Sequence, residues 1–319
     1  MGGEHRATTV GLALGLWSAL VWGGQFIVVK GAYAHVGPTQ INAIRYVPIA
    51  LILLAILARV EGRGALRAGG HGRLVVLLGI GVLLFNDLNY VGLDYTRPQN
   101  ASLISALTPL VAVLLLWGIT GARPRAATFA LVGVALVGVV LVISRGDPGG
   151  YLDEGAHWGD LLCILGVGAF AAYTIGVGRA TTISPLRLTA LSSLVSMVLM
   201  IAVAVVAAAV GFDPYPSARD LVAATPAILY IAIPGAVIAM LAWNRSARLI
   251  GGQNTALLMN LVPITVLVIE LIRGYEPAAL EYVGAALVLA AVTTNNLLLR
   301  RDSRAARIEA IAAESRVGA

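Results

Sequence analysis

The sequence consists of long apolar runs that follow one another from residue 9 to residue 299, separated by short polar turns. Each run has about 20 residues, the length of helix that crosses the ~30 Å hydrocarbon core of a bilayer. Hydrophobic residues make up 59% of the chain and charged residues 12%, whereas soluble domains are about half apolar and about a quarter charged. No soluble domain of useful size remains between the runs. The chain is therefore expected to be a polytopic membrane protein.

Ten segments of this kind can be placed in the sequence. Their ranges are 9–30, 38–58, 74–95, 99–118, 126–144, 158–178, 185–210, 221–244, 254–272 and 279–299. Gly37-Pro38 and Ser184-Pro185 are among the pairs that separate them, and such pairs favour turns. The runs lack the period-two alternation of a membrane β-barrel. The expected fold class is therefore all-α integral membrane, with ten transmembrane helices.

The basic residues divide unevenly between the loops on the two sides. One side carries sixteen of them: Arg6, Arg59, Arg63, Arg67, Arg73, Arg123, Arg125, Arg179, Arg187, Arg245, Arg248, Arg300, Arg301, Arg304, Arg307 and Arg316. The other side carries five: Lys30, Arg97, Arg145, Arg219 and Arg273. Short cytoplasmic loops carry the excess of Lys and Arg, so residues 1–8 and the tail, 300–319, are expected in the cytoplasm. Arg304, Ile308 and Ile311 of the tail are compatible with a surface helix, although a frayed segment is favoured. Residues 145–157 would form an extracytoplasmic linker. The strong preference for arginine over lysine favours a bacterial protein of the cell (inner) membrane.

A short stretch in the first half returns in the second half. QNASLISALTP at 99–109 and QNTALLMNLVP at 253–263 share Gln, Asn, two Leu and Pro at matching positions. Each is followed by a Gly-x-x-Pro turn, at 121–124 and at 274–277. The order of these features predicts two copies of a five-helix unit, 9–144 and 158–299. Because five is odd, the second copy would sit inverted in the membrane, and inverted repeats with a site between them are typical of transporters.

These features resemble the EamA-type exporters of the drug/metabolite transporter (DMT) superfamily. The resemblance rests on the Gly-x-x-Pro turn after a Pro-containing span, the aromatic-rich first helix ending in Lys30, and Pro38 followed by Arg45-Tyr46. It appears in both halves, although the acid that the family carries in the turn is present only in the second half, as Glu276. The resemblance implies a ten-helix basket with a central cavity that exports metabolites such as amino acids or drug-like solutes. It does not specify the substrate.

Two ionisable residues fall inside the predicted spans at similar depth. Arg45 and Asp87 lie roughly 10–12 Å below the outer surface, at ~1.5 Å of rise per helical residue. Charges inside a membrane usually face the protein interior and have a partner, so a buried pair between the two is geometrically possible. Such a pair either locks the two helices structurally, or leaves Asp87 to bind a proton or a substrate ammonium. Asp87, Tyr90 and Asp94, at i, i+3 and i+7, are expected to share one helix face.

Further charged residues and two prolines lie at positions where a carrier would move. Glu270 either snorkels outward or takes part in proton coupling. The other candidate for proton coupling is Asp87. Lys30 and Arg179 occupy equivalent ends on opposite faces, as interfacial anchors or as gates that attract an anionic substrate. Pro109 and Pro263 belong to the repeated stretch and free backbone carbonyls of their helices. We therefore predict hinges at both prolines.

A substrate cavity with an aromatic and small-polar lining is expected between the two repeats. Trp22 lies near mid-membrane, too deep for the usual interfacial belt of Trp and Tyr. The candidate cavity residues are Trp22, Gln25, Arg45, Asn86, Asp87, Tyr90, Ser102, Ser105, Phe170, Tyr173, Trp243, Asn254 and Asn260. The alternative is that these side chains only pack or bridge helices, as hydroxyls and amides do in bilayers.

Motifs for ATP hydrolysis and for metal chemistry are missing from the sequence. Lys30 is the only lysine and lies outside any GxxxxGK[ST] motif. The four histidines lack the paired spacing of a zinc site, and Cys163 stands alone. We therefore expect neither an enzyme nor a cofactor or metal, and the scattered basic residues argue against nucleic acid as a partner.

The predicted function is a secondary carrier that works by alternating access. The family resemblance favours export of amino acids, related metabolites or amphipathic solutes. The partners would be a small-molecule substrate, the lipid bilayer and, as a candidate coupling ion, the proton. A facilitative uniporter or a channel is the alternative. The substrate, the coupling ion and the choice between monomer and homodimer stay open.

Overall fold

The computed structural model describes residues 2–121, 123–147, 158–180 and 182–317, and every regular element in these ranges is helical. The first half contains α1 (Gly2–Ala32), α2 (Pro38–Val60), the 3-10 turns η1 (Arg63–Leu66) and η2 (Gly69–His71), α3 (Gly72–Tyr95), α4 (Pro98–Ala106), α5 (Thr108–Thr120) and α6 (Ala126–Ile143). The second half contains α8 (Trp158–Arg179), α9 (Pro185–Ala209), α10 (Ala218–Tyr230), the π-helix η3 (Ile231–Ile238), α11 (Ala239–Ile250), α12 (Gly252–Leu258), α13 (Leu261–Ile272) and α14 (Ala279–Val317).

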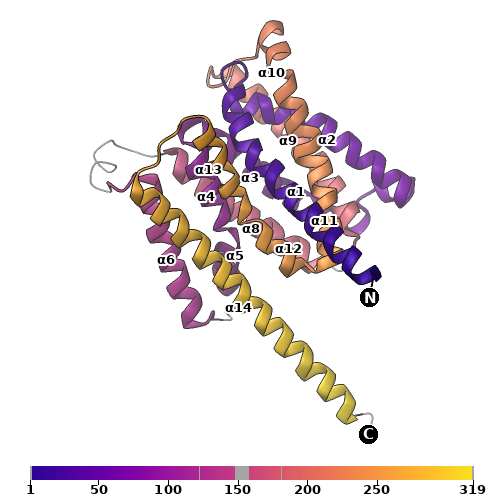
Figure 1. Cartoon of the computed structure of the whole chain (residues 1–319). Coiled ribbons are helices and arrows are strands. Elements are labelled where there is room, and N and C mark those ends of the chain that lie inside the picture. The colour runs from indigo at the N-terminus through magenta and orange to yellow at the C-terminus, as the bar shows by residue number, and fades with distance from the viewer. Residues whose placement is uncertain (1, 122, 148–157, 181, 318–319) are drawn as a thin grey trace.

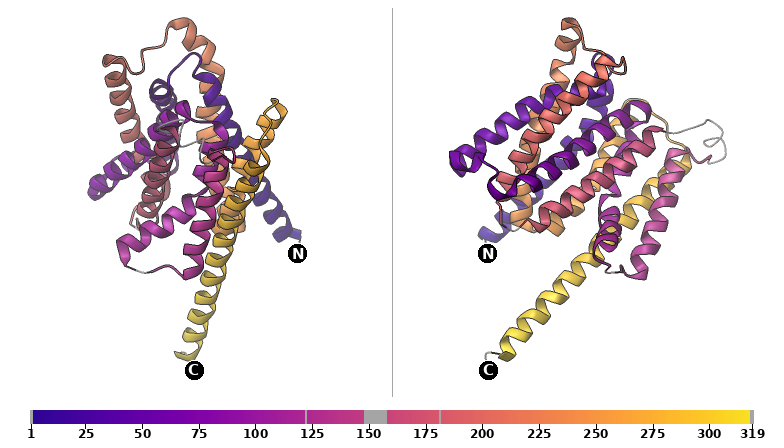
Figure 2. Two further views of the ribbon diagram at one scale, coloured as in Figure 1. Left: turned by 90° about the vertical axis from the view of Figure 1, so that its left-hand side faces the viewer. Right: turned by 180° about the vertical axis from the view of Figure 1, so that it is seen from behind.

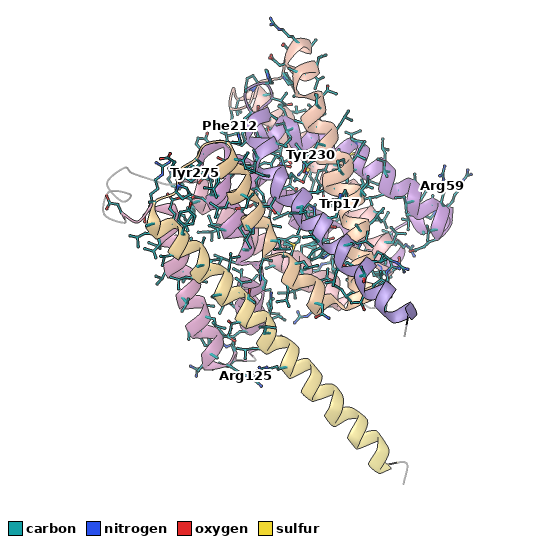
Figure 3. All side chains as sticks on the ribbon, viewed as in Figure 1. Trp17, Arg59, Arg125, Phe212, Tyr230 and Tyr275 are labelled. Carbon is teal, nitrogen blue, oxygen red and sulfur yellow. The ribbon has the colours of Figure 1, made fainter. Side chains whose placement is uncertain are left out.

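The helices form one bundle, and both described chain ends lie at the same end of it (Figure 1). We name this the termini end, and the end with the α1–α2 and α13–α14 turns the far end. Figure 3 shows Phe212 and Tyr275 at the far end and Arg125 toward the termini end.

Seven helical segments among the described residues are long and apolar enough to cross a membrane, with α10, η3 and α11 counted together as one segment. The number is eight if the bent pair α4–α5 also counts as one span. The chain is therefore an all-helical, multi-pass membrane protein, as expected, while the number ten stays a prediction. The expected span 99–118 consists of two helices bent by 45°. The expected span 254–272 is likewise divided, into α12 and α13.

The tail is helical, whereas a frayed segment was favoured from the sequence. Residues 300–317 continue the helix of the predicted last span, 279–299, and together they form the 39-residue helix α14. Figures 1 and 2 show this helix projecting past the rest of the bundle at the termini end. The tail is rich in Ala, Arg and Glu, residues with high helix propensity that allow the last span to continue.

Helices from the two halves pack against each other in a repeated pattern. The contact of α1 with α11 has a counterpart in the contact of α8 with α3, because each pairs the first helix of one half with a helix in the third segment of the other. In addition, α2 packs on α9, α4 on α13 and α6 on α14. Figure 2 shows this interleaving of early and late segments. The two halves therefore form one bundle rather than two separate domains.

Two of these contacts depend on glycines that face each other. A Cβ atom on Gly138 of α6 would lie 2.6 Å from the carbonyl oxygen of Gly284 in α14. A Cβ atom on Gly92 of α3 would lie 2.7 Å from the carbonyl oxygen of Gly159 in α8. Glycine lets helix backbones approach this closely, which is how many membrane helices associate.

Both copies of the repeated stretch contain a helix break a few residues before the proline. The α4–α5 break falls at Leu107, before Pro109, and the α12–α13 break falls at 259–260, before Pro263. A proline cannot donate to the carbonyl four residues earlier. The carbonyl of Ser105 instead accepts the hydroxyl of Thr108 at 2.7 Å, and the carbonyl of Met259 accepts the amide of Val262 at 3.0 Å. The sequence repeat is therefore also a repeat of backbone geometry.

The Gly-x-x-Pro turns share their geometry as well. Gly121 has φ 72° and Gly274 has φ 88°, values that glycine adopts with little cost. Gly121 caps α5 through its amide, which donates to the carbonyl of Trp117. The amide of Gly274 donates to the carbonyl of Leu271. Each glycine therefore ends the second part of a broken helix.

Candidate functional site

Arg45 lies at the centre of a buried polar network between α2 and α3. Only 2% of its surface is exposed. Its Nε donates to Oδ1 of Asn42 at 2.9 Å, and its Nη2 donates to Oδ1 of Asn86. The guanidinium carbon lies 4.3 Å from the ring centroid of Tyr90 and 5.2 Å from that of Tyr46. The charge is thus held by amide oxygens and aromatic faces, contacts that stabilise a cation away from water.

Asn42 bridges Arg45 and Asp87, which do not pair directly. Nδ2 of Asn42 donates to Oδ1 of Asp87 at 2.7 Å, while its Oδ1 accepts from Arg45. Asn42 and Arg45 stand three residues apart on α2 and therefore share a face. The direct ion pair considered from the sequence is thus replaced by an amide bridge. Oδ2 of Asp87 is buried and has no hydrogen-bond partner among the described residues.

Gln25 and Tyr90 extend the network to α1. Nε2 of Gln25 donates to the Tyr90 hydroxyl at 3.0 Å. The Tyr33 hydroxyl donates to the carbonyl of Tyr90 at 2.7 Å. Asn86 donates its Nδ2 to the Tyr46 hydroxyl at 3.0 Å. Candidate cavity residues of three helices, α1, α2 and α3, therefore belong to one connected set of hydrogen bonds.

Asp87 and Tyr90 meet different neighbours although they are close on α3. Tyr90 packs against Arg45 and faces α1. Asp87 lines a groove of about 500 Å³ formed mainly by α3 and the second half of α9. Asp94, the third residue expected on this face, is exposed near the helix end. The carboxylate of Asp87 therefore lies between the buried network on one side and an apolar groove on the other.

The candidate aromatic residues form two separate groups rather than one lining. Trp22 packs against Trp243, with ring centroids 5.1 Å apart and the rings tilted by 51°, and its Nε1 donates to the carbonyl of Gly235 at 2.8 Å. That carbonyl belongs to η3, and π-helical turns are frequent at functional sites. Phe170 stands 4.5 Å from Phe85 and 6.1 Å from Tyr173 by ring centroids. The first group joins α1 to η3 and α11, and the second joins α3 to α8.

Most of the small polar candidates bind within their own helix pair. The hydroxyls of Ser102 and Ser105 donate to the carbonyls of Gln99 and Ala101, at 2.9 and 2.8 Å. Nδ2 of Asn254 donates to the carbonyl of Ile250. Nδ2 of Asn260 instead donates to Thr293 Oγ1 of α14 at 2.8 Å. These side chains therefore belong to the two broken helices, and their bonds show no convergence on the Arg45 network.

The charged candidates near the span ends are held by specific contacts. Lys30 Nζ donates to the carbonyls of Leu93 and Asp94, at 2.8 and 2.6 Å, and such cations stabilise helix C-termini. Glu270 accepts from Arg273 Nη1 at 3.1 Å and from Nε2 of Gln99 at 3.4 Å. Arg179 is the exposed last residue of α8. Lys30 therefore ties α1 to α3 at the far end, and Glu270 ties α13 to α4.

Among the residues that the structure describes, three buried acids were not singled out from the sequence: Asp160, Asp213 and Glu281. Asp160 accepts the hydroxyl of Thr96 at 2.6 Å, and Asp213 accepts the amide and hydroxyl of Thr39 at 2.8 and 2.6 Å. All three stand at helix ends or turns, where acids are common on solvated surfaces. The sequence does contain one signal for a residue such as Asp213. Helix α2 starts with Pro38 and has no capping side chain of its own, so its free backbone amides need an acceptor from elsewhere in the chain.

Arg97 and Glu281 form a second polar centre at the far end. Arg97 Nη1 lies 3.5 Å from Glu281 Oε2, and Nη2 donates to the carbonyl of Val142 at 3.1 Å. The hydroxyl of Tyr275 donates to Glu281 Oε2 at 2.6 Å and also contacts Arg97. Burial, together with the hydrogen bond to Glu281, raises the pKa of Tyr275. This centre, which we call the Arg97 lock, joins the start of α4 to the end of α6 and the start of α14.

The chain resembles known proteins along almost its whole length. The EamA-like transporter family matches residues 9–144 and again residues 157–297. The uncharacterized transporter YrdR of Bacillus subtilis (strain 168) is 28% identical over 299 residues, which cover 92% of this chain and 93% of that protein. The uncharacterized transporter YyaM of the same organism is 28% identical over 281 residues, covering 87% and 90%. An uncharacterized transporter of Archaeoglobus fulgidus is 26% identical over 247 residues, covering 77% and 82%.

The fold is shared with a solved structure. A protein crystal structure superposes with a TM-score of 0.62 at 19% identity, covering 93% of this chain and 98% of that one. At this identity the likeness concerns the fold alone. The family match covers most of both halves, and the relatives above carry the name of transporters, so the resemblance drawn from the sequence is confirmed. This chain is a multi-pass membrane protein that belongs to the EamA-like transporter family.

Proposed function

We propose that this chain is a secondary carrier that exports small solutes by alternating access, with ten spans in two inverted repeats of five. The repeats would be 9–144 and 158–299, joined by the linker 145–157, of which 148–157 lie outside the described residues. Inverted repeats that rock about a site between them are a common basis of alternating access.

The repeated pattern of helix contacts carries the proposal. In this assignment α1 corresponds to α8, α2 to α9, α3 to the segment α10–α11, α4–α5 to α12–α13, and α6 to α14. Exchanging the two sets turns the α1–α11 contact into the α8–α3 contact. It leaves the α2–α9 and α6–α14 contacts unchanged. A pseudo-two-fold axis between the halves has this property, and similarity of composition alone does not produce it.

The paired helix breaks supply the moving parts in this mechanism. Both precede a proline of the repeated stretch, Pro109 or Pro263. Both also occur where the helix contacts the other repeat, since α4 packs on α13. Broken helices at membrane depth are tolerated where protein satisfies their free backbone groups. We propose that the two breaks act as equivalent hinges, one for each side of the membrane.

The buried network supports small zwitterionic solutes, such as amino acids, as the substrate class. Arg45 offers a guanidinium, which binds carboxylates well, and Asp87 offers a carboxylate for an ammonium group. The two are linked through Asn42 within one network that reaches α1, α2 and α3. Opposite charges at fixed separation complement the two ends of an amino acid.

Asp87 is favoured over Glu270 as the proton-coupling residue. Both oxygens of Glu270 have a partner, Arg273 for one and Gln99 for the other. Asp87 has a partner on Oδ1 only. An acid inside a span with spare acceptor capacity is a typical proton site of transporters.

The distribution of sixteen basic residues on one side and five on the other favours cytoplasmic termini in a bacterial inner membrane.

Transport can be tested with purified protein in liposomes. The vesicles are loaded with a mixture of amino acids and small metabolites, and release is followed by mass spectrometry with and without a pH gradient. Wild type is compared with Asp87→Asn and with Asp94→Asn, which removes the same charge from the exposed end of α3. We expect saturable, gradient-dependent release that Asp87→Asn abolishes and Asp94→Asn preserves.

The other outcomes separate the alternatives. Saturable release that ignores both the gradient and Asp87→Asn indicates a facilitative uniporter. Large release without saturation indicates a channel and contradicts alternating access. Replacing both Pro109 and Pro263 with Ala tests the hinges, because unchanged transport in that double variant removes their proposed role.

A further inference from the structure

The groove beside Asp87 opens sideways from the bundle rather than into its centre. Its wall on α9 includes Val206 and Val210, whose surfaces are 61% and 72% exposed. The rest of the lining is formed mainly by Leu83 and Leu88 of α3, Leu162 of α8 and Leu199 of α9. In a multi-pass membrane protein, exposed apolar side chains of this kind face lipid. The groove is therefore accessible from the hydrocarbon phase.

Asp87 is the one polar group on the groove that lacks a full set of partners. The other polar residue on the lining is Thr39, whose hydroxyl already donates to Asp213 at 2.6 Å. Oδ1 of Asp87 accepts from Asn42, while Oδ2 is buried without a donor among the described residues. An acceptor left without a donor away from water costs free energy. A ligand that brings a donor to this oxygen recovers that loss.

We propose that the groove binds an amphipathic ammonium compound that reaches it from the membrane. Its ammonium would bind the carboxylate of Asp87, and its hydrocarbon part would fill the apolar walls of α3 and α9. Because Oδ2 is covered at the groove floor, the carboxylate must turn outward about its side-chain torsions when the ligand binds. The proposal concerns binding and does not depend on the transport proposed above.

Charge and size both favour this occupant. A carboxylate in apolar surroundings attracts a cation and disfavours an anion, and Arg45 is held away from it by Asn42. The volume of about 500 Å³ lies within the ~300–1,000 Å³ of typical small-molecule sites. A lipid acyl chain would fit the walls but would leave Oδ2 of Asp87 without a donor, so it is the occupant against which the ammonium must be tested.

The test uses three probes that differ only in one terminal group. Protein in nanodiscs of zwitterionic lipid is dialysed against 2-(1-naphthyl)ethylamine, 2-(1-naphthyl)ethanol or 3-(1-naphthyl)propionate, without any ion gradient. Bound probe is measured by mass spectrometry relative to empty nanodiscs. The variants are Asp87→Asn, Asp94→Asn as the matched charge control, and Ala202→Phe, which places a ring in the groove from α9.

We expect saturable binding of the amine, reduced at least tenfold by Asp87→Asn and by Ala202→Phe and unchanged by Asp94→Asn. Equal binding of the amine and the alcohol, or full binding by Asp87→Asn, overturns the proposal and leaves an apolar site of the lipid-chain type. If Asp87→Asn does not give a monodisperse sample, full binding by Ala202→Phe overturns it instead. Failure of solute flux in liposomes has no bearing on this result, so the two proposals fail separately.

Discussion

The two ends of the bundle use the same backbone design with different chemistry. At the far end, α4 begins at Arg97, which reaches Glu281 and Tyr275 beside the start of α14. The position that matches Arg97 in the second copy is Gly251, and the position that matches Glu281 in the first copy is Thr128. Gly251 has φ 85° and Thr128 is uncharged. The termini end therefore lacks an ion pair at these two described positions.

The comparison separates backbone features, which both halves share, from a side-chain ion pair, which they do not share. Helix breaks and turns are present in both halves because Gly and Pro determine them locally. The charged contact of the Arg97 lock has no counterpart at the two matching positions, Gly251 and Thr128, which the structure describes. In a symmetric bundle, one charged contact makes the two ends unequal in free energy. We expect the far end to be the harder one to open.

The largest effect is expected from removing the charge of Glu281. Glu281→Gln leaves the Arg97 guanidinium without its counter-ion, and breaking a buried pair in this way costs about 3 kcal/mol. The side chain of Glu281 is 6% exposed and that of Arg97 is 25% exposed, so the low end of the usual range applies. The thermal midpoint of the purified protein, measured in detergent and in nanodiscs, reports the loss.

Thr128→Val supplies the matched control at the termini end. It should lower stability by no more than about 1 kcal/mol, the scale of one neutral hydrogen bond. The double variant Arg97→Met with Glu281→Leu should recover most of the loss, because apolar residues can replace a buried pair. A Glu281→Gln protein as stable as wild type would show that the lock contributes nothing to closure of the far end.

The turn glycines should give equal effects at the two ends. Gly121→Ala and Gly274→Ala each place a Cβ in a left-handed conformation, which costs roughly 1–2 kcal/mol. Neither new Cβ meets any atom within 4 Å, so the cost is backbone strain alone. Thermal midpoints of the two variants should fall by similar amounts. A loss confined to one variant would mean that the two turns are not equivalent.

The smallest effect is expected from Tyr275→Phe, which removes one hydroxyl from the lock. The lost hydrogen bond to Glu281 is worth about 1 kcal/mol. The pKa of Tyr275 is raised by burial and by Glu281, so its contribution is complete below the ordinary tyrosine pKa of ~10. It is lost as the pH rises through the raised value. Stability measured from pH 7 to pH 11 should therefore fall more steeply at its upper end in wild type than in Tyr275→Phe.

Backbone features were largely predictable from the sequence. The repeated stretch and its prolines indicated matching disturbances in two helices, and breaks are found before Pro109 and Pro263. The Gly-x-x-Pro turns indicated helix ends, which are found at Gly121 and Gly274. Membrane spans followed from run length alone. These signals are local, since each depends on a few neighbouring residues.

Side-chain contacts were less predictable because they depend on helix rotation. Asp87 and Tyr90 are three residues apart, which places them about 60° apart around the helix axis. That angle is enough to direct one toward α9 and the other toward α1. The bridge through Asn42 could not be read from depth alone, since depth places Arg45 and Asp87 level without showing what lies between them. The role of Asp213 required the partner helix, which the sequence does not supply.

Because α14 is long, a small tilt of this helix moves its last residues by a large distance. The helix crosses α6 at Gly284 and continues to Val317, about 50 Å further at ~1.5 Å per residue. A tilt of roughly 10° at that crossing would displace the tip by roughly 9 Å, given this rise per residue. Small rearrangements of the bundle are thus magnified at the end of the chain. A spectroscopic label there would record changes of state without touching any residue inside the membrane.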